Sequence, residues 1–291
     1  MVAVGWAVPT LLLVLVMCGC AKKPEPVRMP QGESSTMRII SMAPNLTEIL
    51  SALGLEEEIV GVTKFSTYPP QAKEITNVGT FWQPDIEAVL TCRPTLVLTL
   101  GFAQQTVLAD RLKHIGCETL TLDIESIEQL YAAIEVIGQK VDKVAEAQLL
   151  IEKLQDKQAQ LVGKYADASP RKVLWVIQRE PLRVAGTNTF INELIEVAGG
   201  VNAIGDTIHQ YPPISDEEVI GSMPDVIIEP VMDPEQFENQ KETAKEFYQQ
   251  FGPIPAVQNE RICIIDGDLV SRLGPRLDEG LRMIAEYIWS E

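Results

Sequence analysis

Two charged residues and one tryptophan stand where this sequence could contact a bound molecule. Asp268 and Arg272 are four residues apart and follow an apolar stretch that ends at Asp266. Trp82 lies in a short Gly-Thr-Phe-Trp-Gln-Pro loop. Loops at strand ends line the clefts of α/β proteins, so these side chains could hydrogen-bond to a ligand or stack on it. The alternatives are a surface ion pair for Asp268 and Arg272, and a place in the core for Trp82.

The patterns that accompany catalysis or a resident metal are not found in the chain. There is no Gly-x-Ser-x-Gly elbow and no Gly-x-Gly-x-x-Gly loop, and the Gly-Thr-Asn-Thr turn at 186–189 is not followed by a phosphate-binding lysine. Only His114 and His209 could supply imidazole ligands. We therefore expect no catalytic residue, no cofactor and no metal site. Cys92, Cys117 and Cys263 form no Cys-x-x-Cys pair and are expected to be buried free thiols.

The charge of the chain argues against nucleic acid as a partner. The sequence has 24 Lys and Arg against 41 Asp and Glu, a formal net charge of -17. Such a surface repels phosphate backbones. The 291 residues are enough for two compact lobes.

The N-terminus resembles a bacterial lipoprotein signal. An apolar run at 11–17 is too short to span a bilayer and is followed by Cys18-Gly19-Cys20. Cleavage before Cys20 would leave a lipid-modified cysteine as the first residue, although no Lys or Arg precedes the run; an uncleaved anchor helix is the alternative. Residues 1–19 are thus predicted to be a signal peptide and residues 20–36 a polar tether. We expect the protein in the cell envelope, anchored in the periplasm or on the outer face of the cytoplasmic membrane.

The rest of the chain alternates apolar runs with helical stretches, which is typical of an α/β fold. Runs without polar alternation indicate parallel strands covered on both faces. A first lobe is predicted at 37–140 and a second at 169–291. One helix is expected to begin at Asn45, with Glu48 completing a capping box, and another at Pro84. A third is expected after Ser215, with Glu218 as its capping-box partner. Strands are predicted at 38–42, 59–63, 96–100, 119–123, 173–178, 226–229 and 262–266, and further helices at 104–115, 189–197 and 277–289.

One long helix is predicted in the segment at 141–168 that joins the lobes. A stripe spaced alternately by three and four residues runs through 143–165, which would be roughly 35 Å long. The stripe consists of Val144, Ala147, Ile151, Leu154, Gln158, Leu161 and Tyr165. The expected fold is two Rossmann-like lobes with parallel sheets, joined by a rigid helix. A cleft between the lobes would be the default binding site.

Several motifs resemble those of the helical-backbone substrate-binding proteins of ABC importers, which serve cobalamin, haem and ferric siderophores. They are Arg38-Ile-Ile-Ser-Met-Ala-Pro-Asn-Leu-Thr-Glu48, Tyr68-Pro-Pro, Val78-Gly-Thr-Phe-Trp-Gln-Pro-Asp-Ile-Glu87, Arg93-Pro-Thr-Leu-Val-Leu98, Phe190-Ile-Asn-Glu-Leu194, Ala198-Gly-Gly200 and Gly274-Pro-Arg276. The resemblance extends from Met37 to the end of the chain. It implies a monomeric binding protein that works with a permease and its ATPase. A lipid-anchored hydrolase is the alternative from another class.

The cobalamin-binding members of that family are the most similar in their site motifs. The resemblance implies ligand contacts by Phe65, Trp82, Tyr211, Asp268 and Arg272. Aromatic rings can pack on a corrin, and Asp and Arg can hydrogen-bond its amide arms and phosphate.

Two other ligands stay open. Haem could use Tyr68 as its axial ligand, and a ferric siderophore would suit Arg272 and Arg276.

The resemblance also implies an acidic residue on each lobe that docks on arginines of the permease. Glu87 matches the position in the first lobe. The acid of the second lobe is expected after Gly199-Gly200, where Val201 stands instead, and Glu196 and Asp206 are the alternatives.

Overall fold

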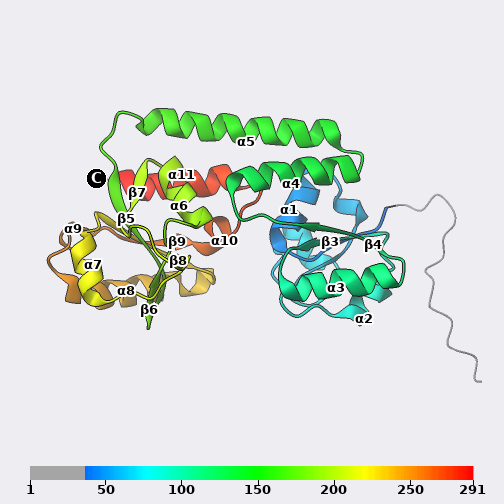
Figure 1. The fold of residues 1–291 in the computed structure, drawn as a ribbon, viewed down its shortest axis with the longest axis horizontal. Helices are drawn as coiled ribbons and strands as arrows, with labels where there is room; N and C mark the ends of the chain where they lie inside the picture. Colours follow the sequence, from blue (N-terminus) through cyan, green and yellow to red (C-terminus); the bar gives the residue numbers. More distant parts are fainter. Residues whose placement is uncertain (1–36, 291) are drawn as a thin grey trace, which may run out of the picture.

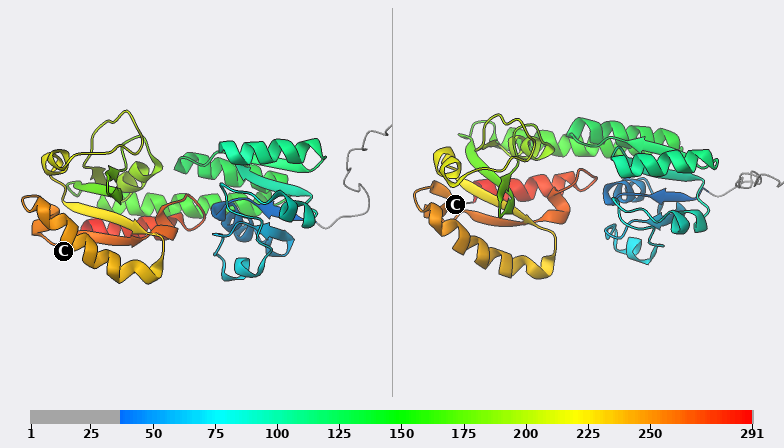
Figure 2. Two further views of the ribbon diagram at one scale, coloured as in Figure 1. Left: turned by 90° about the horizontal axis from the view of Figure 1, so that it is seen from below. Right: turned by 60° about the horizontal axis from the view of Figure 1, so that its bottom comes forward.

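The computed structural model describes residues 37–290, which form two α/β lobes side by side (Figure 1), as two further views also show (Figure 2). The predicted signal peptide, tether and Cys20 lie outside the described residues. The two lobes and their largely parallel sheets agree with the fold predicted from the sequence.

The first lobe is built on four parallel strands in the order β2-β1-β3-β4. Its central strands are apolar runs buried along their whole length, as expected for a sheet covered on both faces. The strands are β1 (Ile39–Ser41), β2 (Ile59–Val62), β3 (Leu96–Leu100) and β4 (Glu118–Leu122), and the helices are α1 (Pro44–Ala52), α2 (Ile86–Thr91), α3 (Ala103–His114) and α4 (Ile127–Lys140).

The second lobe contains a sheet in the order β6-β5-β8-β9, with β7 also paired to β5. All of its pairings are parallel except that of β6, which forms a hairpin with β5 at the edge. The strands are β5 (Arg171–Arg179), β6 (Leu182–Val184), β7 (Gly200–Asn202), β8 (Val226–Val231) and β9 (Ile262–Asp266). The helices are α6 (Phe190–Val197), α7 (Asp216–Ser222), α8 (Phe237–Tyr248), α9 (Pro255–Gln258), α10 (Gly267–Val270) and α11 (Leu277–Trp289).

The predicted connecting helix is α5 (Val144–Tyr165), and it runs along the top of both lobes in Figure 1. Its stripe packs on α4 and α11, and Ala147, Ile151, Leu154 and Leu161 are buried, whereas Val144 at its first turn is exposed. Gln158, the polar member of the stripe, accepts a hydrogen bond of 2.7 Å from the Tyr131 hydroxyl on α4. No helix within residues 37–290 combines the length and the apolar character needed to cross a bilayer.

The two earliest helix starts predicted from the sequence are wrong. Pro44 takes the first position of α1, so Ala43 is the N-cap; Asn45 lies within the first turn, where its Oδ1 accepts from the Leu46 N–H at 3.1 Å. Likewise Asp85 is the N-cap of α2 and accepts from the Ala88 N–H at 3.0 Å, so that helix begins after Pro84. The capping box of Ser215 and its partner three residues on is confirmed.

The three cysteines of the described residues are free, as predicted. Cys92 and Cys117 are buried, whereas Cys263 on β9 is only half-buried.

Candidate functional site

Four aromatic rings form a continuous partly exposed surface on the first lobe. Phe65 and Trp82 have ring centroids 5.7 Å apart, Trp82 and Phe81 4.3 Å, and Phe81 and Phe102 5.8 Å. Phe65, Trp82 and Phe102 each keep 43–45% of their surface exposed. A place in the core is therefore excluded for Trp82. These four residues are called the aromatic surface below.

A buried glutamine holds the loop that carries Phe81 and Trp82. Gln105, on α3, is fully buried; its Oε1 accepts from the Leu100 N–H at 2.6 Å, and its Nε2 donates to Met42 O at 2.9 Å and Phe81 O at 3.0 Å. At the base of the loop Gly79 has φ +98°, and a Cβ there would lie 2.5 Å from Gln83 O. The loop is thus fixed at both its start and its tip.

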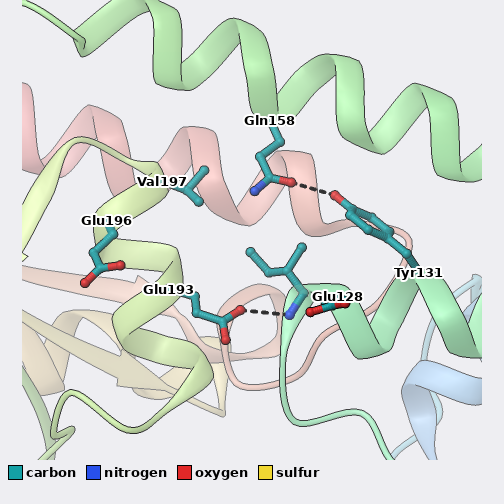
Figure 3. A pocket seen from close by; sticks show the side chains of 7 residues that line it. Glu128, Tyr131, Gln158, Glu193, Glu196 and Val197 are labelled. Atoms are coloured by element: carbon teal, nitrogen blue, oxygen red, sulfur yellow. Dashed lines mark hydrogen bonds between the residues drawn. The ribbon is translucent and has the colours of Figure 1, made fainter.

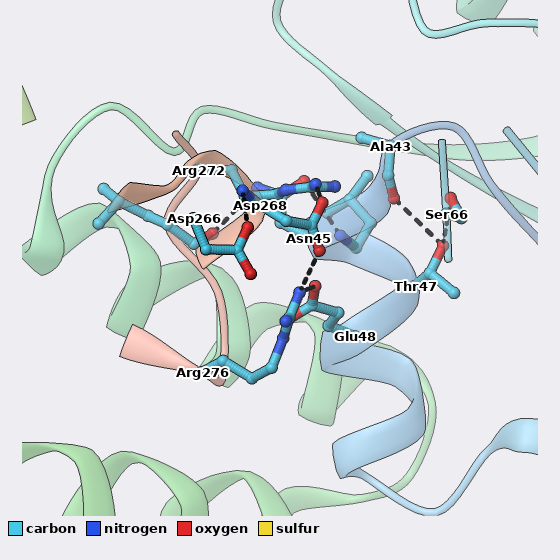
Figure 4. A network of polar contacts seen from close by, with 11 residues as sticks. Ala43, Asn45, Thr47, Glu48, Ser66, Asp266, Asp268, Arg272 and Arg276 are labelled. Carbon is cyan, nitrogen blue, oxygen red and sulfur yellow. Dashed lines mark hydrogen bonds and ion pairs between the residues drawn. The ribbon is translucent and has the colours of Figure 1, made fainter. Parts of the chain in front are cut away.

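The segment that carries Phe65 is fixed by buried hydroxyl groups. Thr47 Oγ1 on α1 lies 2.8 Å from Ser41 Oγ and 3.1 Å from Ser66 Oγ, and Ser66 Oγ lies 3.0 Å from Thr63 Oγ1. Figure 4 shows Thr47 and Ser66 facing each other beside α1. Phe65 follows the end of β2 in this segment, so the hydroxyl groups position its ring.

Four charged side chains form a network where the two lobes meet (Figure 4). Asp268 pairs with both Arg272 and Arg276, and Arg276 also makes a two-pronged ion pair with Glu48 of α1, in which Nε lies 3.0 Å from Oε2. The side chain of Glu48 is 4% exposed, and those of Arg276 and Arg272 are 14% and 17% exposed. Glu48, Asp268, Arg272 and Arg276 are called the ion network below. The pair of Asp268 and Arg272 is a partly buried member of this network, since the side chain of Asp268 is 30% exposed and also pairs with Arg276.

The pKa directions in the ion network follow from burial and from its alternating charges. Burial lowers the pKa of Arg272, although the charge of Glu48 opposes this. Burial also acts to lower the pKa of Arg276, but the hydrogen bond and charge of Glu48 outweigh it and the pKa is raised. An arginine guanidinium keeps its charge at neutral pH in either case.

Tyr68 contacts the ion network and follows Phe65 closely in the sequence. It stands three residues after Phe65, remains 43% exposed, and has the Arg276 guanidinium carbon 4.2 Å from its ring centroid. Of the residues singled out from the sequence, the structure thus pairs Phe65 with Trp82 and connects Tyr68, Asp268 and Arg272 through Arg276.

Within the described residues, Tyr211 has no recorded side-chain contact with this group. It packs partly buried against the core, and Arg183 Nη1 donates to its carbonyl at 3.1 Å. Burial raises the pKa of its hydroxyl, and the charge of Glu125 adds to this.

The residues expected to contact a permease are on the surface. Glu87 is exposed in the first turn of α2, and Val201 on β7 is 43% exposed. Of the alternatives, Glu196 accepts from Asn192 Nδ2 at 2.8 Å and Asp206 accepts from the Thr187 hydroxyl at 3.1 Å.

Two hollows lie elsewhere among the residues that the structure describes. One of about 310 Å³ is lined by α4, α5 and α6, where Glu193 Oε2 accepts from the Ile127 N–H at 2.8 Å (Figure 3). The second, of about 420 Å³, lies between α5 and α11. Neither is lined by the aromatic surface or the ion network, and no group of three or more potential metal ligands occurs within 37–290.

The sequence reasoning missed Phe102, Gln105 and Glu48 as parts of this site. Phe102 had a usable signal, because it follows a predicted strand end just as Phe65 does. Gln105 and Glu48 lie on helices and gave no signal, because their partners are distant in the sequence. An aromatic face beside paired charges can bind a large ligand that has a flat ring and polar edges.

Comparisons with known proteins agree with this reading of the fold. Residues 39–269 match the periplasmic binding protein family. The chain is 31% identical over 262 residues to YvrC, a substrate-binding lipoprotein of an ABC transporter from Bacillus subtilis, covering 87% of this chain and 80% of that one. It is 29% identical to the vitamin B12-binding protein of Vibrio cholerae, covering 86% and 88%. The structure of the periplasmic haem-binding protein HutB of Vibrio cholerae superposes with a TM-score of 0.78 at 26% identity, covering 88% of this chain and all of that one.

Proposed function

The chain belongs to the periplasmic binding protein family, and we propose that its ligand is a corrinoid of the cobalamin type. As a family member it is the substrate-binding protein of an ABC transporter, and the family consists of transport components that are not enzymes. The proposal concerns which ligand it captures and how it delivers that ligand.

The observation that carries the proposal is the exposed aromatic surface of the first lobe, together with the ion network that Tyr68 contacts. A corrin is a large flat ring with amide arms. Trp82 and Phe65 offer partly exposed rings for apolar packing, and Asp268 and Arg272 offer an acceptor and donors at the edge. We propose that the ligand lies between the lobes against these residues, and that Tyr211 contacts it from the second lobe. Similarity to a vitamin B12-binding protein supports this choice.

Binding measurements with two single substitutions test the proposal. W82A removes a stacking ring and R272A removes a charged donor. Each should weaken cyanocobalamin binding about tenfold or more, measured by calorimetry. E146Q on the exposed surface of α5 is a control that should bind like the unchanged protein. Unaltered affinity in both site variants would refute the corrinoid site.

Haem is the second candidate ligand because Tyr68 is 43% exposed and its phenol could serve as an axial ligand. Similarity to the haem-binding protein HutB supports it. Absorption spectra of the protein mixed separately with cobalamin and haemin distinguish the two ligands by their visible bands. If the protein shows the bands of bound haem and Y68F does not, haem replaces the corrinoid as the proposed ligand. If neither ligand gives the bands of a bound form, a ferric siderophore is favoured.

We also propose that the protein is a monomer held at the cell envelope by lipid on Cys20, with residues 21–36 as its tether. Mass spectrometry of the mature protein should find an acylated Cys20 as its first residue. A mature chain that begins elsewhere would remove the anchor from the proposal.

We propose that each lobe docks on the permease through one acidic residue in the first turn of a helix. Glu87 is the second residue of α2, which leads into β3. In the same way α7 leads into β8, and β3 and β8 each lie next to the first strand of their own sheet. Both helices lie on the side away from α5 (Figure 1). Asp216 and Glu217 are exposed in the first turn of α7, whereas Glu218 accepts from the Ser215 N–H. We therefore propose Glu217, in place of Val201, as the second docking acid.

Charge reversal separates docking from ligand capture. E87R and E217R should each lower ligand uptake by cells while the affinity of the purified protein for the ligand stays the same. E146R reverses a charge on α5, away from both helices, and is the control. Normal uptake by the E87R/E217R double variant would remove the docking proposal and leave ligand capture unaffected.

A further inference from the structure

The second lobe reaches the first lobe through the short segment between α10 and α11. Asn45 Nδ2 on α1 donates to Leu273 O at 3.1 Å, and a Cβ on Gly274 would lie 3.4 Å from Glu48 Oε2. Arg276 ends this segment as the N-cap of α11 and pairs with Glu48. This segment therefore packs directly on α1, and Arg276 supplies its charged contact.

A single guanidinium contacts residues of both lobes. Arg276 pairs with Glu48 of the first lobe through two nitrogens, its Nη2 lies 3.0 Å from Asp268 Oδ2 of the second lobe, and its plane covers the Tyr68 ring. Glu48 in turn lies on the same helix as Thr47, which holds the segment of Phe65. A shift of Arg276 must therefore move residues of both lobes together.

The burial of this ion pair makes it sensitive to substitution. Removing one partner of a buried pair leaves an uncompensated charge, which costs far more than the loss of an exposed pair. The planar fork of arginine also matches the carboxylate with two parallel bonds, which lysine cannot reproduce.

We propose that Arg276 is a positioning residue that locks the two lobes together in the ligand-free protein and thereby sets the places of Tyr68 and Asp268. The lock is a property of the protein alone. Its effect on affinity rests on the proposed corrinoid function. Binding then needs little rearrangement, because the contact residues of both lobes are already in place.

Hydrogen exchange of the ligand-free protein tests the lock without any ligand. In R276M, backbone amides should exchange faster in two segments at once, around Tyr68 in the first lobe and at 267–273 in the second. R276K should show the same pattern because it keeps the charge but loses the fork. R282M, an exposed arginine change on α11, is the matched control and should leave both segments unchanged. Faster exchange confined to the second lobe in R276M would overturn the proposal.

A double-mutant cycle tests whether Arg276 acts through Glu48. E48Q and R276M should each weaken cyanocobalamin binding about tenfold, and the double variant should bind about as weakly as R276M alone. The double variant carries no unpaired charge, so it stays measurable if R276M folds poorly. Losses that multiply in the double variant would show independent roles and overturn the coupling. If the unchanged protein binds no cobalamin, the proposed ligand is wrong, and hydrogen exchange alone decides whether the lock exists.

Discussion

Replacing Gln105 by leucine should destabilise the protein and loosen its aromatic surface at the same time. The Gln105 side chain is fully buried and makes three hydrogen bonds to backbone groups, those of Leu100, Met42 and Phe81. Leucine has a similar volume but no polar atom, so it would leave all three backbone groups without this partner. Each such bond contributes about 1 kcal/mol net, and an unpaired buried group costs about 1–3 kcal/mol.

The expected loss for Q105L is therefore at least about 3 kcal/mol in the free energy of unfolding. For a chain of this size that corresponds to a fall of roughly 6 °C or more in the thermal midpoint. Cyanocobalamin affinity should fall as well, because the carbonyl of Phe81 loses the bond that fixes the loop of Trp82.

Thermal unfolding followed by circular dichroism, together with calorimetric titration, checks both effects. Q104L makes the same chemical change at the preceding, exposed position of α3 and should change the midpoint little. If Q105L and Q104L unfold at the same temperature, the hydrogen bonds of Gln105 do not hold the loop as argued.

Three further outcomes are expected. Burial raises the pKa of Cys263 to about 11, so its thiolate forms only at higher pH. At pH 8 iodoacetamide should therefore modify Cys263 about 100-fold more slowly in the folded protein than in unfolded protein. Equal rates of modification, measured by peptide mapping, would contradict this. R179M leaves the buried carboxylate of Glu229 without its arginine and should lower the unfolding free energy in urea by about 3–5 kcal/mol, whereas R179M/E229Q should recover much of that loss. G79A should lower the free energy of unfolding by more than about 1 kcal/mol, because the new Cβ would meet Gln83 O at a positive φ. G205A should be tolerated, because a Cβ there meets nothing within 4 Å. Equal stability of the two variants would refute the strained turn.

Local patterns in the sequence were sufficient for most of the elements. Strands β3 and β9 and helix α11 have the bounds predicted, because continuous apolar runs and a regular apolar stripe report burial directly. Helix α4 was not predicted, although its buried Ile127, Leu130, Ile134 and Ile137 have helical spacing. The three-residue strands β6 and β7 are too short to give a pattern, and they form because β5 offers its edge.

The candidate site could be predicted only in part. Phe65, Tyr68 and Trp82 carry signals of residue type and loop position, and the structure places them at one surface. Asn45 and Glu48 were predicted to cap a helix, because their spacing fits a capping box. The sequence does not show which residues of the other lobe lie beside them. In the fold both side chains instead contact the segment at 273–276.

What the sequence by itself determined was the α/β class, the long connecting helix and the family resemblance, since each rests on neighbours along the chain. What only the tertiary structure decided was which charges meet. Glu48 and Arg276 are 228 residues apart, and no periodicity links them. Their pairing depends on the relative position of the two lobes, which α5 and the packing of the two cores determine. A buried ion pair forms only where packing excludes water and brings both partners within bonding distance.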